Sequence, residues 1–198
     1  MKERPILFSG EMVRAILDGR KTQTRRPYNP KAGFPREDGE VTPTTASAWT
    51  DYGPCPLGQP GDRLWVRETW GLMAHHDPTD WHRGSIDGAS EDAITPMFGV
   101  EHRANWKIEN ENAFWRPSIH MPRWASRITL EINRVWVERV QDITDQDAFN
   151  EGAPTTSGCL DDPCVMSFRQ GFHDLWQSIY GTWDSNPWVW AVEFRRTK

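Results

Sequence analysis

Residues 126–140 constrain the fold more than any other stretch, because they carry a clear β pattern over an unusual length. Apolar side chains alternate with polar ones, as in a half-buried strand, and the alternation breaks near Asn133 and Arg134. The apolar positions are Ile128, Leu130, Ile132, Val135, Val137 and Val140. This pattern predicts either one long, bent strand or a hairpin, so the fold has to be built around a sheet.

Shorter strands and three helices are predicted on either side of this stretch. The strand patterns cover 64–68, 98–103 and 188–194. Helical spacing and capping residues predict helices from Ser9 to Gly19, from Thr144 to Gly152, and over 168–179 with Gly181 just beyond the end. Strands interrupted by a few helices predict an α+β fold, namely a small, partly open β-barrel of mixed or antiparallel strands with flanking helices.

The length of 198 residues fits one domain that spans the whole chain, 1–198. Two stretches rich in proline, glycine and polar residues, at about 27–60 and 71–115, are predicted to be irregular, loop-rich insertions. The three cysteines are too few for a disulfide framework and are expected to be free thiols.

Composition and charge exclude several classes of protein. The net charge of −5 argues against a protein that coats nucleic acid through bulk electrostatics, although a local basic site is compatible with it. No apolar run approaches the roughly 20 residues of a membrane span. The first residues, Met-Lys-Glu-Arg-Pro, lack the apolar centre of a signal peptide, so a cytoplasmic location without a membrane partner is expected.

The first helix leads directly into the most chemically distinctive segment, Gly19–Arg26. Four cations and two threonines fall within its eight residues. Such a cluster suits an anionic or nucleotide-like ligand. Its positive charges would also lower the pKa of Lys21 by repulsion.

This segment resembles the hallmark of the ASCH family, which has the PUA-like superfold. The family's string is Gly-x-Lys-x-x-Glu-x-Arg, and here Thr24 stands where the glutamate is usual. The bacterial N4-acetylcytidine amidohydrolases, which are ASCH-like, carry Gly-Arg-Lys-Thr-x-Thr-x-Arg instead. This chain reproduces all fixed residues of that string: Gly19, Arg20, Lys21, Thr22, Thr24 and Arg26.

The resemblance covers about residues 5–26, 61–68, 126–151 and 168–195, and the full pattern is similar to an expanded member common in phages and prophages. It implies a hydrolase that converts N4-acetylcytidine, or a related modified nucleoside, to cytidine and acetate without metal or cofactor. By analogy, Thr24 would be the nucleophile, Lys21 the base and Glu151 the acid or orienting partner.

Three alternatives stay open. Lys21 and Glu151 would form a purely structural ion pair if the site had no activity, with Thr24 an ordinary strand residue. A non-catalytic protein that binds RNA, DNA or a modified base would use the same cleft. A ribonuclease would use the Lys21 cluster to stabilise a phosphorane, with His120 as the first candidate for its base.

Further residues are candidates for substrate binding. The expected partners are a nucleoside or modified base and single-stranded RNA or DNA. Within the motif the candidates are Arg20 and Arg26. Arg67 and Glu68 form either a structural pair or part of the pocket mouth, and Trp65 lies beside them. Arg123 and Trp124 have the cation-plus-aromatic character of a nucleic-acid surface, unless the tryptophan is core.

Histidines and cysteines elsewhere do not predict a metal site, because they lack regular ligand spacing. The residues considered for this role are His75, His76, Asp77, His82, Cys159 and Cys164.

Overall fold

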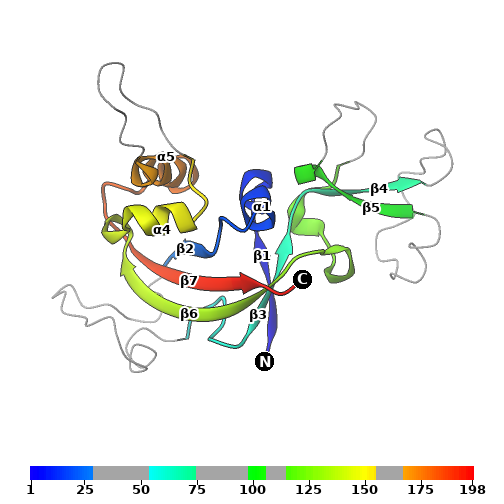
Figure 1. Cartoon of the computed structure of the whole chain (residues 1–198), viewed down its shortest axis with the longest axis horizontal. Helices are drawn as coiled ribbons and strands as arrows, with labels where there is room; N and C mark the ends of the chain where they lie inside the picture. The colour runs from blue at the N-terminus through cyan, green and yellow to red at the C-terminus, as the bar shows by residue number, and fades with distance from the viewer. Residues whose placement is uncertain (29–53, 75–97, 106–114, 155–166) are drawn as a thin grey trace, which may run out of the picture.

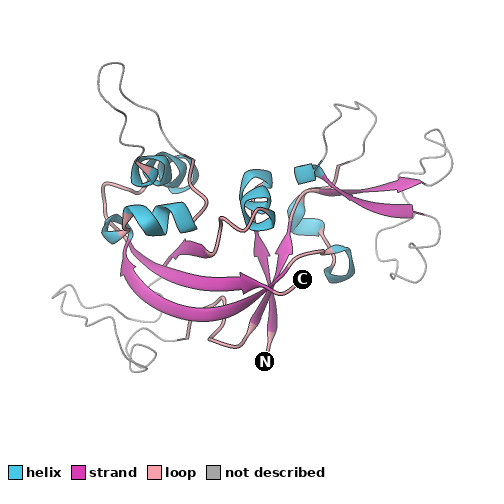
Figure 2. Ribbon diagram, in the orientation of Figure 1, coloured by secondary structure: helices cyan, strands magenta, loops and turns pink. Residues whose placement is uncertain are grey.

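The computed structural model describes residues 1–28, 54–74, 98–105, 115–154 and 167–198. These residues form two sheets and three α-helices (Figure 2). The strands are β1 (Glu3–Leu7), β2 (Gln23–Pro27), β3 (Arg63–Arg67), β4 (Trp70–Ala74), β5 (Phe98–His102), β6 (Thr129–Arg139) and β7 (Trp188–Arg196). The helices are α1 (Gly10–Leu17), α4 (Asp145–Asn150) and α5 (Phe168–Tyr180).

The larger sheet has five strands in the order β1-β3-β6-β7-β2, and β4 and β5 form the smaller sheet. Strands β1 and β3 are parallel, whereas every other pairing is antiparallel. The α+β class predicted from the sequence is therefore confirmed. Helices α4 and α5 lie together at one end of the large sheet, and the β4–β5 sheet extends from the other end (Figure 1).

Strand β6 is one long strand, not a hairpin. It pairs with β7 from Leu130 to Arg139, and the register shifts between Ile132 and Arg134. This bulge lies where the sequence alternation breaks, and a bulge bends the strand that carries it. The bend gives β6 and β7 the shared curvature that wraps the sheet around its core (Figure 1).

The strands of the described residues form open sheets, so the predicted barrel is not found there. Strands β1 and β2 are the two edges of the large sheet and share no ladder. Helix α1 connects them, and its buried Val13 and Ile16 join the core, so a helix fills the position where a strand ladder would close a barrel. The Arg26 side chain crosses this seam, with Nη2 donating to the Leu7 carbonyl at 2.9 Å.

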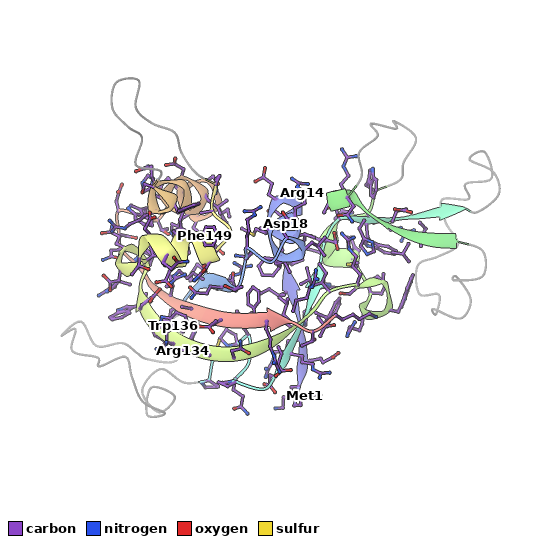
Figure 3. All side chains as sticks on the ribbon, in the orientation of Figure 1. Met1, Arg14, Asp18, Arg134, Trp136 and Phe149 are labelled. Atoms are coloured by element: carbon purple, nitrogen blue, oxygen red, sulfur yellow. The ribbon has the colours of Figure 1, made fainter. Side chains whose placement is uncertain are left out.

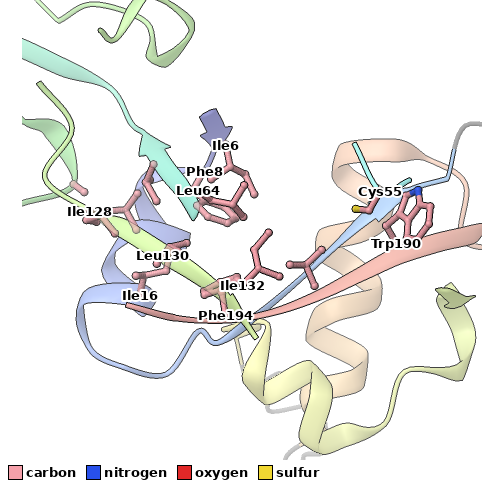
Figure 4. Close-up of a cluster of buried hydrophobic side chains, with 14 of the residues drawn as sticks. Ile6, Phe8, Ile16, Cys55, Leu64, Ile128, Leu130, Ile132, Trp190 and Phe194 are labelled. Carbon is pink, nitrogen blue, oxygen red and sulfur yellow. The ribbon is translucent and has the colours of Figure 1, made fainter. Parts of the chain in front are cut away.

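Apolar side chains gather in three clusters. The main core lies in the concavity of the large sheet and includes Phe8, Leu64, Leu130, Ile132 and Phe194 (Figure 4). A second cluster packs α4 and α5 against β7 and the turn after β6. A third joins the small sheet to the segment before β6 and includes Trp70, Leu72, Met121 and Ala125.

The region expected to be an irregular insertion at 71–115 contains a regular sheet. Strand β5 matches the strand predicted at 98–103, but β4 was not predicted, because its sequence Trp-Gly-Leu-Met-Ala does not alternate apolar with polar residues. Strands β1 and β2 were not predicted either. The remaining residues of the two insertions at 29–53, 75–97 and 106–114 lie outside the described residues.

The other predicted elements are confirmed. The Ser9 hydroxyl caps α1 by accepting from the Met12 amide, and the Thr144 hydroxyl caps α4 by accepting from the Asp147 amide. Gly181 follows α5 with a φ of 63°. Within the described chain, every helix is too short or too polar to cross a membrane.

Candidate functional site

The turn from α1 into β2 is tight and is held from several sides. Gly19 has a φ of 75°, the left-handed conformation that glycine adopts most easily. The amides of Arg20 and Lys21 both donate to the Ala15 carbonyl. The Thr22 amide then donates to the Asn150 carbonyl at the end of α4. These bonds place the start of β2 directly beside the end of α4.

Lys21 occupies the centre of this junction, with no exposed side-chain surface. Its Nζ donates to Glu151 Oε2 and to the Glu151 carbonyl at 2.7 Å each, and to the Gln23 carbonyl at 2.8 Å. Three acceptors match the three N–H groups of an ammonium. The geometry is therefore that of protonated Lys21 in an ion pair with Glu151.

Burial lowers the pKa of Lys21, and it is the largest influence on this group. The charge and hydrogen bond of Glu151 oppose this effect, and repulsion from Arg26 and Arg25 adds to it as a smaller contribution. The repulsion expected from the sequence is therefore present, but burial contributes more to the lowered pKa of Lys21. Arg20 is exposed and pairs with Asp18 at 3.4 Å.

Glu151 reaches Lys21 because it is the C-cap residue of α4. Both its backbone carbonyl and its carboxylate face the lysine. The structure thus brings together Lys21 and Glu151, which the resemblance had paired across 130 positions of the sequence.

Arg25 is a second buried cation at the site, and the sequence did not single it out. Its Nη1 donates to Glu151 Oε1 and to Gln23 Oε1 at 3.2 Å each, and its Nε donates to Glu138 Oε1 at 2.6 Å. Its Nη2 lies 3.8 Å from Asp147 Oδ2. One signal pointed to this arrangement: residues 21, 23 and 25 alternate along the strand and so share one face.

Thr24 lies on the opposite face of β2, opposite Val192 of β7, and is completely buried. Its Oγ1 accepts from Arg26 Nη1 at 3.0 Å. The Arg26 guanidinium and Lys21 Nζ each lie 5.3 Å from the centre of the Phe8 ring. Arg26 and Lys21 therefore converge near Phe8, and Thr24 contacts this group through Arg26, although no hydrogen bond links Lys21 to Thr24 in the described structure.

A cavity of about 220 Å³ borders this group at Gly152. It lies between the start of α1 and α5. Its lining includes Ser9, Glu11, Asp174 and Ser178. Gly152 lines the cavity and also packs closely on Lys21, since a Cβ at Gly152 would lie 3.2 Å from the Lys21 Cβ.

The other substrate-binding candidates do not form one pocket with this group. Glu68 is fully buried and accepts from Arg127 through both carboxylate oxygens, at 2.9 and 3.0 Å. This bidentate pair joins the end of β3 to the segment before β6. Trp124 packs edge-to-face on Trp70 with 5.9 Å between ring centres, so it belongs to the third core cluster.

Trp65, Arg67 and Arg123 gather on the outer face of β3, opposite the buried Leu64 and Val66. The guanidinium of Arg67 lies 5.1 Å and that of Arg123 lies 5.9 Å from the Trp65 ring centre. Arg123 also pairs with Glu3 at 3.0 Å. This group, called the outer-face cluster below, is separate from Lys21.

Stacked arginine and tryptophan pairs recur elsewhere in the molecule. The guanidinium of Arg134 lies 4.8 Å and that of Arg25 lies 6.0 Å from the ring centre of Trp136 on β6. Arg134 and Trp136 are labelled in Figure 3. Several of the tryptophans therefore serve to cover arginine side chains.

No cluster of three metal-binding side chains occurs within the described ranges. His75, His76, Asp77, His82, Cys159 and Cys164 all lie outside them.

No protein-family model, no curated protein and no solved structure matches this chain.

Proposed function

We propose that this protein is an ASCH-like amidohydrolase that acts on N4-acylated cytidine or a related modified nucleoside. One observation carries the proposal: the Lys21–Glu151 pair is buried in direct contact, at the site where the motif string places the catalytic lysine and its carboxylate partner. A solvent-excluded lysine with a lowered pKa is suited to accept a proton.

The proposed PUA-like fold is supported by the arrangement of the large sheet. Its mixed strands curl around one core, and α1 connects the two edge strands. The Gly19–Arg26 segment lies at the seam between those edges, where Arg26 reaches the Leu7 carbonyl.

In the proposed first step, Thr24 Oγ attacks the carbonyl carbon of the acetyl group, and its proton passes to neutral Lys21. Collapse of the tetrahedral intermediate breaks the bond from the acyl carbon to N4. The proton held by Lys21 goes to the departing N4, which yields cytidine and an acetyl ester on Thr24. Arg26, whose Nη1 lies 3.0 Å from the Thr24 oxygen, would stabilise negative charge there.

In the second step, water attacks the ester carbon while Lys21 again takes a proton. The bond to Thr24 Oγ breaks, acetic acid leaves and loses its remaining proton to solvent, and the threonine hydroxyl regains its proton from Lys21. Glu151 stays ionised throughout and orients the lysine. To reach Thr24, the Lys21 amine must break one of its three hydrogen bonds. The lysine side chain therefore has to move before the proton is transferred.

The test is to incubate the full chain with N4-acetylcytidine and to follow the ultraviolet change on deacetylation. Wild type should turn the substrate over. Lys21→Met and Glu151→Gln should lower kcat by about a hundredfold or more, because each removes a group that handles the proton. Arg134→Gln, on β6 outside the Lys21 contacts, is the control variant. Absence of turnover by folded wild type would contradict the proposal.

A second candidate function is binding of single-stranded nucleic acid without chemistry, and the outer-face cluster favours it. A tryptophan flanked by two arginines can stack on bases and contact phosphates. Trp65→Ala and Arg123→Ala should then weaken binding to a single-stranded RNA, measured by fluorescence anisotropy. Arg195→Ala is a matched control, since Arg195 also pairs with a glutamate, Glu131, at 2.9 Å. If wild type and all variants bound the RNA equally well, the outer-face cluster would not be a nucleic-acid binding site.

A further inference from the structure

The Glu151 carboxylate is shared between two buried cations. Its Oε2 accepts from Lys21 at 2.7 Å, and its Oε1 accepts from Arg25 at 3.2 Å. A carboxylate held through both oxygens cannot rotate about its last bond without losing one contact. Arg25 therefore determines which way Glu151 faces.

Arg25 is itself held in place. Its side chain has no exposed surface, and its Nε donates to Glu138 Oε1 at 2.6 Å. Glu138 is fixed in turn by the Trp136 ring N–H, which donates to its Oε2 at 2.6 Å. The planar fork of a guanidinium can hold Glu138 and Glu151 at once, which a lysine ammonium at the same position could not do with the same geometry.

We propose that Arg25 is a positioning residue for the reaction at Lys21: it directs Glu151 Oε2 at the lysine amine and supplies the cation that remains beside Glu151 when Lys21 becomes neutral. This inference rests on the proposed function. If Lys21 were the only cation in contact with Glu151, its loss of a proton would leave a buried carboxylate unpaired, which is strongly unfavourable. Arginine stays protonated, so the partner it provides is permanent.

The charges around Lys21 give the direction of the expected effect. Arg25 and Arg26 face it from β2 and lower its pKa, whereas Glu151 from α4 raises it. Asp147 from α4 and Glu138 from β6 reach the site through Arg25. Removing Arg25 takes away one repulsion and leaves Glu151 entirely to Lys21. Both changes raise the pKa of Lys21.

The test measures the Lys21 titration in two ways. The first is the acid limb of the kcat/KM profile for N4-acetylcytidine. The second is the NMR titration of the lysine ε-carbon with ¹³C-labelled lysine, assigned with Lys21→Arg, which needs no substrate. Arg25→Gln should move both midpoints upward and lower kcat. Arg25→Lys keeps the positive charge but lacks the planar guanidinium that holds Glu138 and Glu151 together. It should therefore shift the Lys21 midpoint less than Arg25→Gln does, and it should also lower kcat.

Arg127→Gln is the control, because it breaks another pair between an arginine and a buried glutamate, the one with Glu68. It should lower stability and leave the Lys21 midpoint unchanged. If Arg25→Gln lowers only stability and its Lys21 midpoint equals that of wild type, the inference is overturned. Should that variant not fold, an unshifted midpoint in Arg25→Lys overturns it. No turnover by wild type would instead contradict the proposed function, since the NMR titration does not depend on activity.

Discussion

Lys21 and Arg25 are cations with no exposed side-chain surface, and carboxylates compensate both of them. Burying an unpaired charge is strongly unfavourable, so each depends on partners that arrive from other elements. Glu151 comes from the end of α4 and Glu138 from β6. Single residues at this junction therefore affect both the position and the protonation of the lysine.

Gly152→Ala should disturb Lys21 directly. Gly152 has a φ of 74°, and a Cβ there would lie 2.8 Å from the Ala15 Cβ and 3.2 Å from the Lys21 Cβ. We expect a loss of about 2 kcal/mol or more in the free energy of unfolding, from backbone strain together with overpacking, and a lower turnover rate. Urea denaturation and the N4-acetylcytidine assay measure the two effects.

Gly181→Ala is the control for this prediction. Gly181 also has a positive φ, 63°, but no atom lies within 4 Å of an added Cβ. It should show the strain alone and keep full turnover. Equal losses of stability and activity in both variants would show that the contact with Lys21 is unimportant.

At the scale of elements, the capping residues and the periodicity were enough to locate the helices and most strands. Ser9, Thr144 and Gly181 each act within a few residues of their own helix, so their effects can be recognised locally. Strands β1, β2 and β4 were missed because their sequences do not alternate apolar with polar residues, and β4 depends on pairing with β5, which begins 24 positions after it ends. Arg25 was missed because its partners Glu138 and Glu151 meet it only through tertiary structure.

The packing of β5 against the segment before β6 predicts a pH effect on stability. His102 Nε2 lies 3.0 Å from the Ala125 carbonyl, and burial lowers the pKa of this histidine, with Glu68 acting in the opposite direction. The unfolded chain therefore binds the proton more readily than the folded chain. The contribution of His102 to stability is complete above the ordinary pKa of about 6.5 and is lost as pH falls through the lowered value.

His102→Gln should remove this contribution to the pH dependence. Urea denaturation at pH 7.5 and at about pH 5 should show a smaller loss of stability on acidification in the variant than in wild type. His173→Gln, which replaces a histidine on α5 that pairs with Asp174 at 2.7 Å, tests whether any histidine would give this result. Identical pH dependence in His102→Gln and wild type would contradict the assignment.

At the scale of the whole molecule, the large sheet curls without closing, and the candidate site lies at the seam. The Arg26 contact to Leu7 links the two edge strands there, and Arg26 from β2 and Lys21 from the turn before it both approach Phe8. The sequence pattern indicated a curved sheet but not how its edges meet, since that depends on where α1 packs. The Lys21–Glu151 contact was expected only from the resemblance, because residues 130 positions apart show no local pattern.

We propose that this seam hydrolyses an N4-acyl group with Thr24 as nucleophile. The most direct measurement compares the rate of N4-acetylcytidine hydrolysis by wild type, Thr24→Ser and Thr24→Ala at equal concentrations of folded protein. The account predicts turnover by wild type, reduced turnover by Thr24→Ser, which keeps a hydroxyl, and a loss of at least about a thousandfold in Thr24→Ala. Hydrolysis by Thr24→Ala at the wild-type rate, or no hydrolysis by wild type, would contradict it.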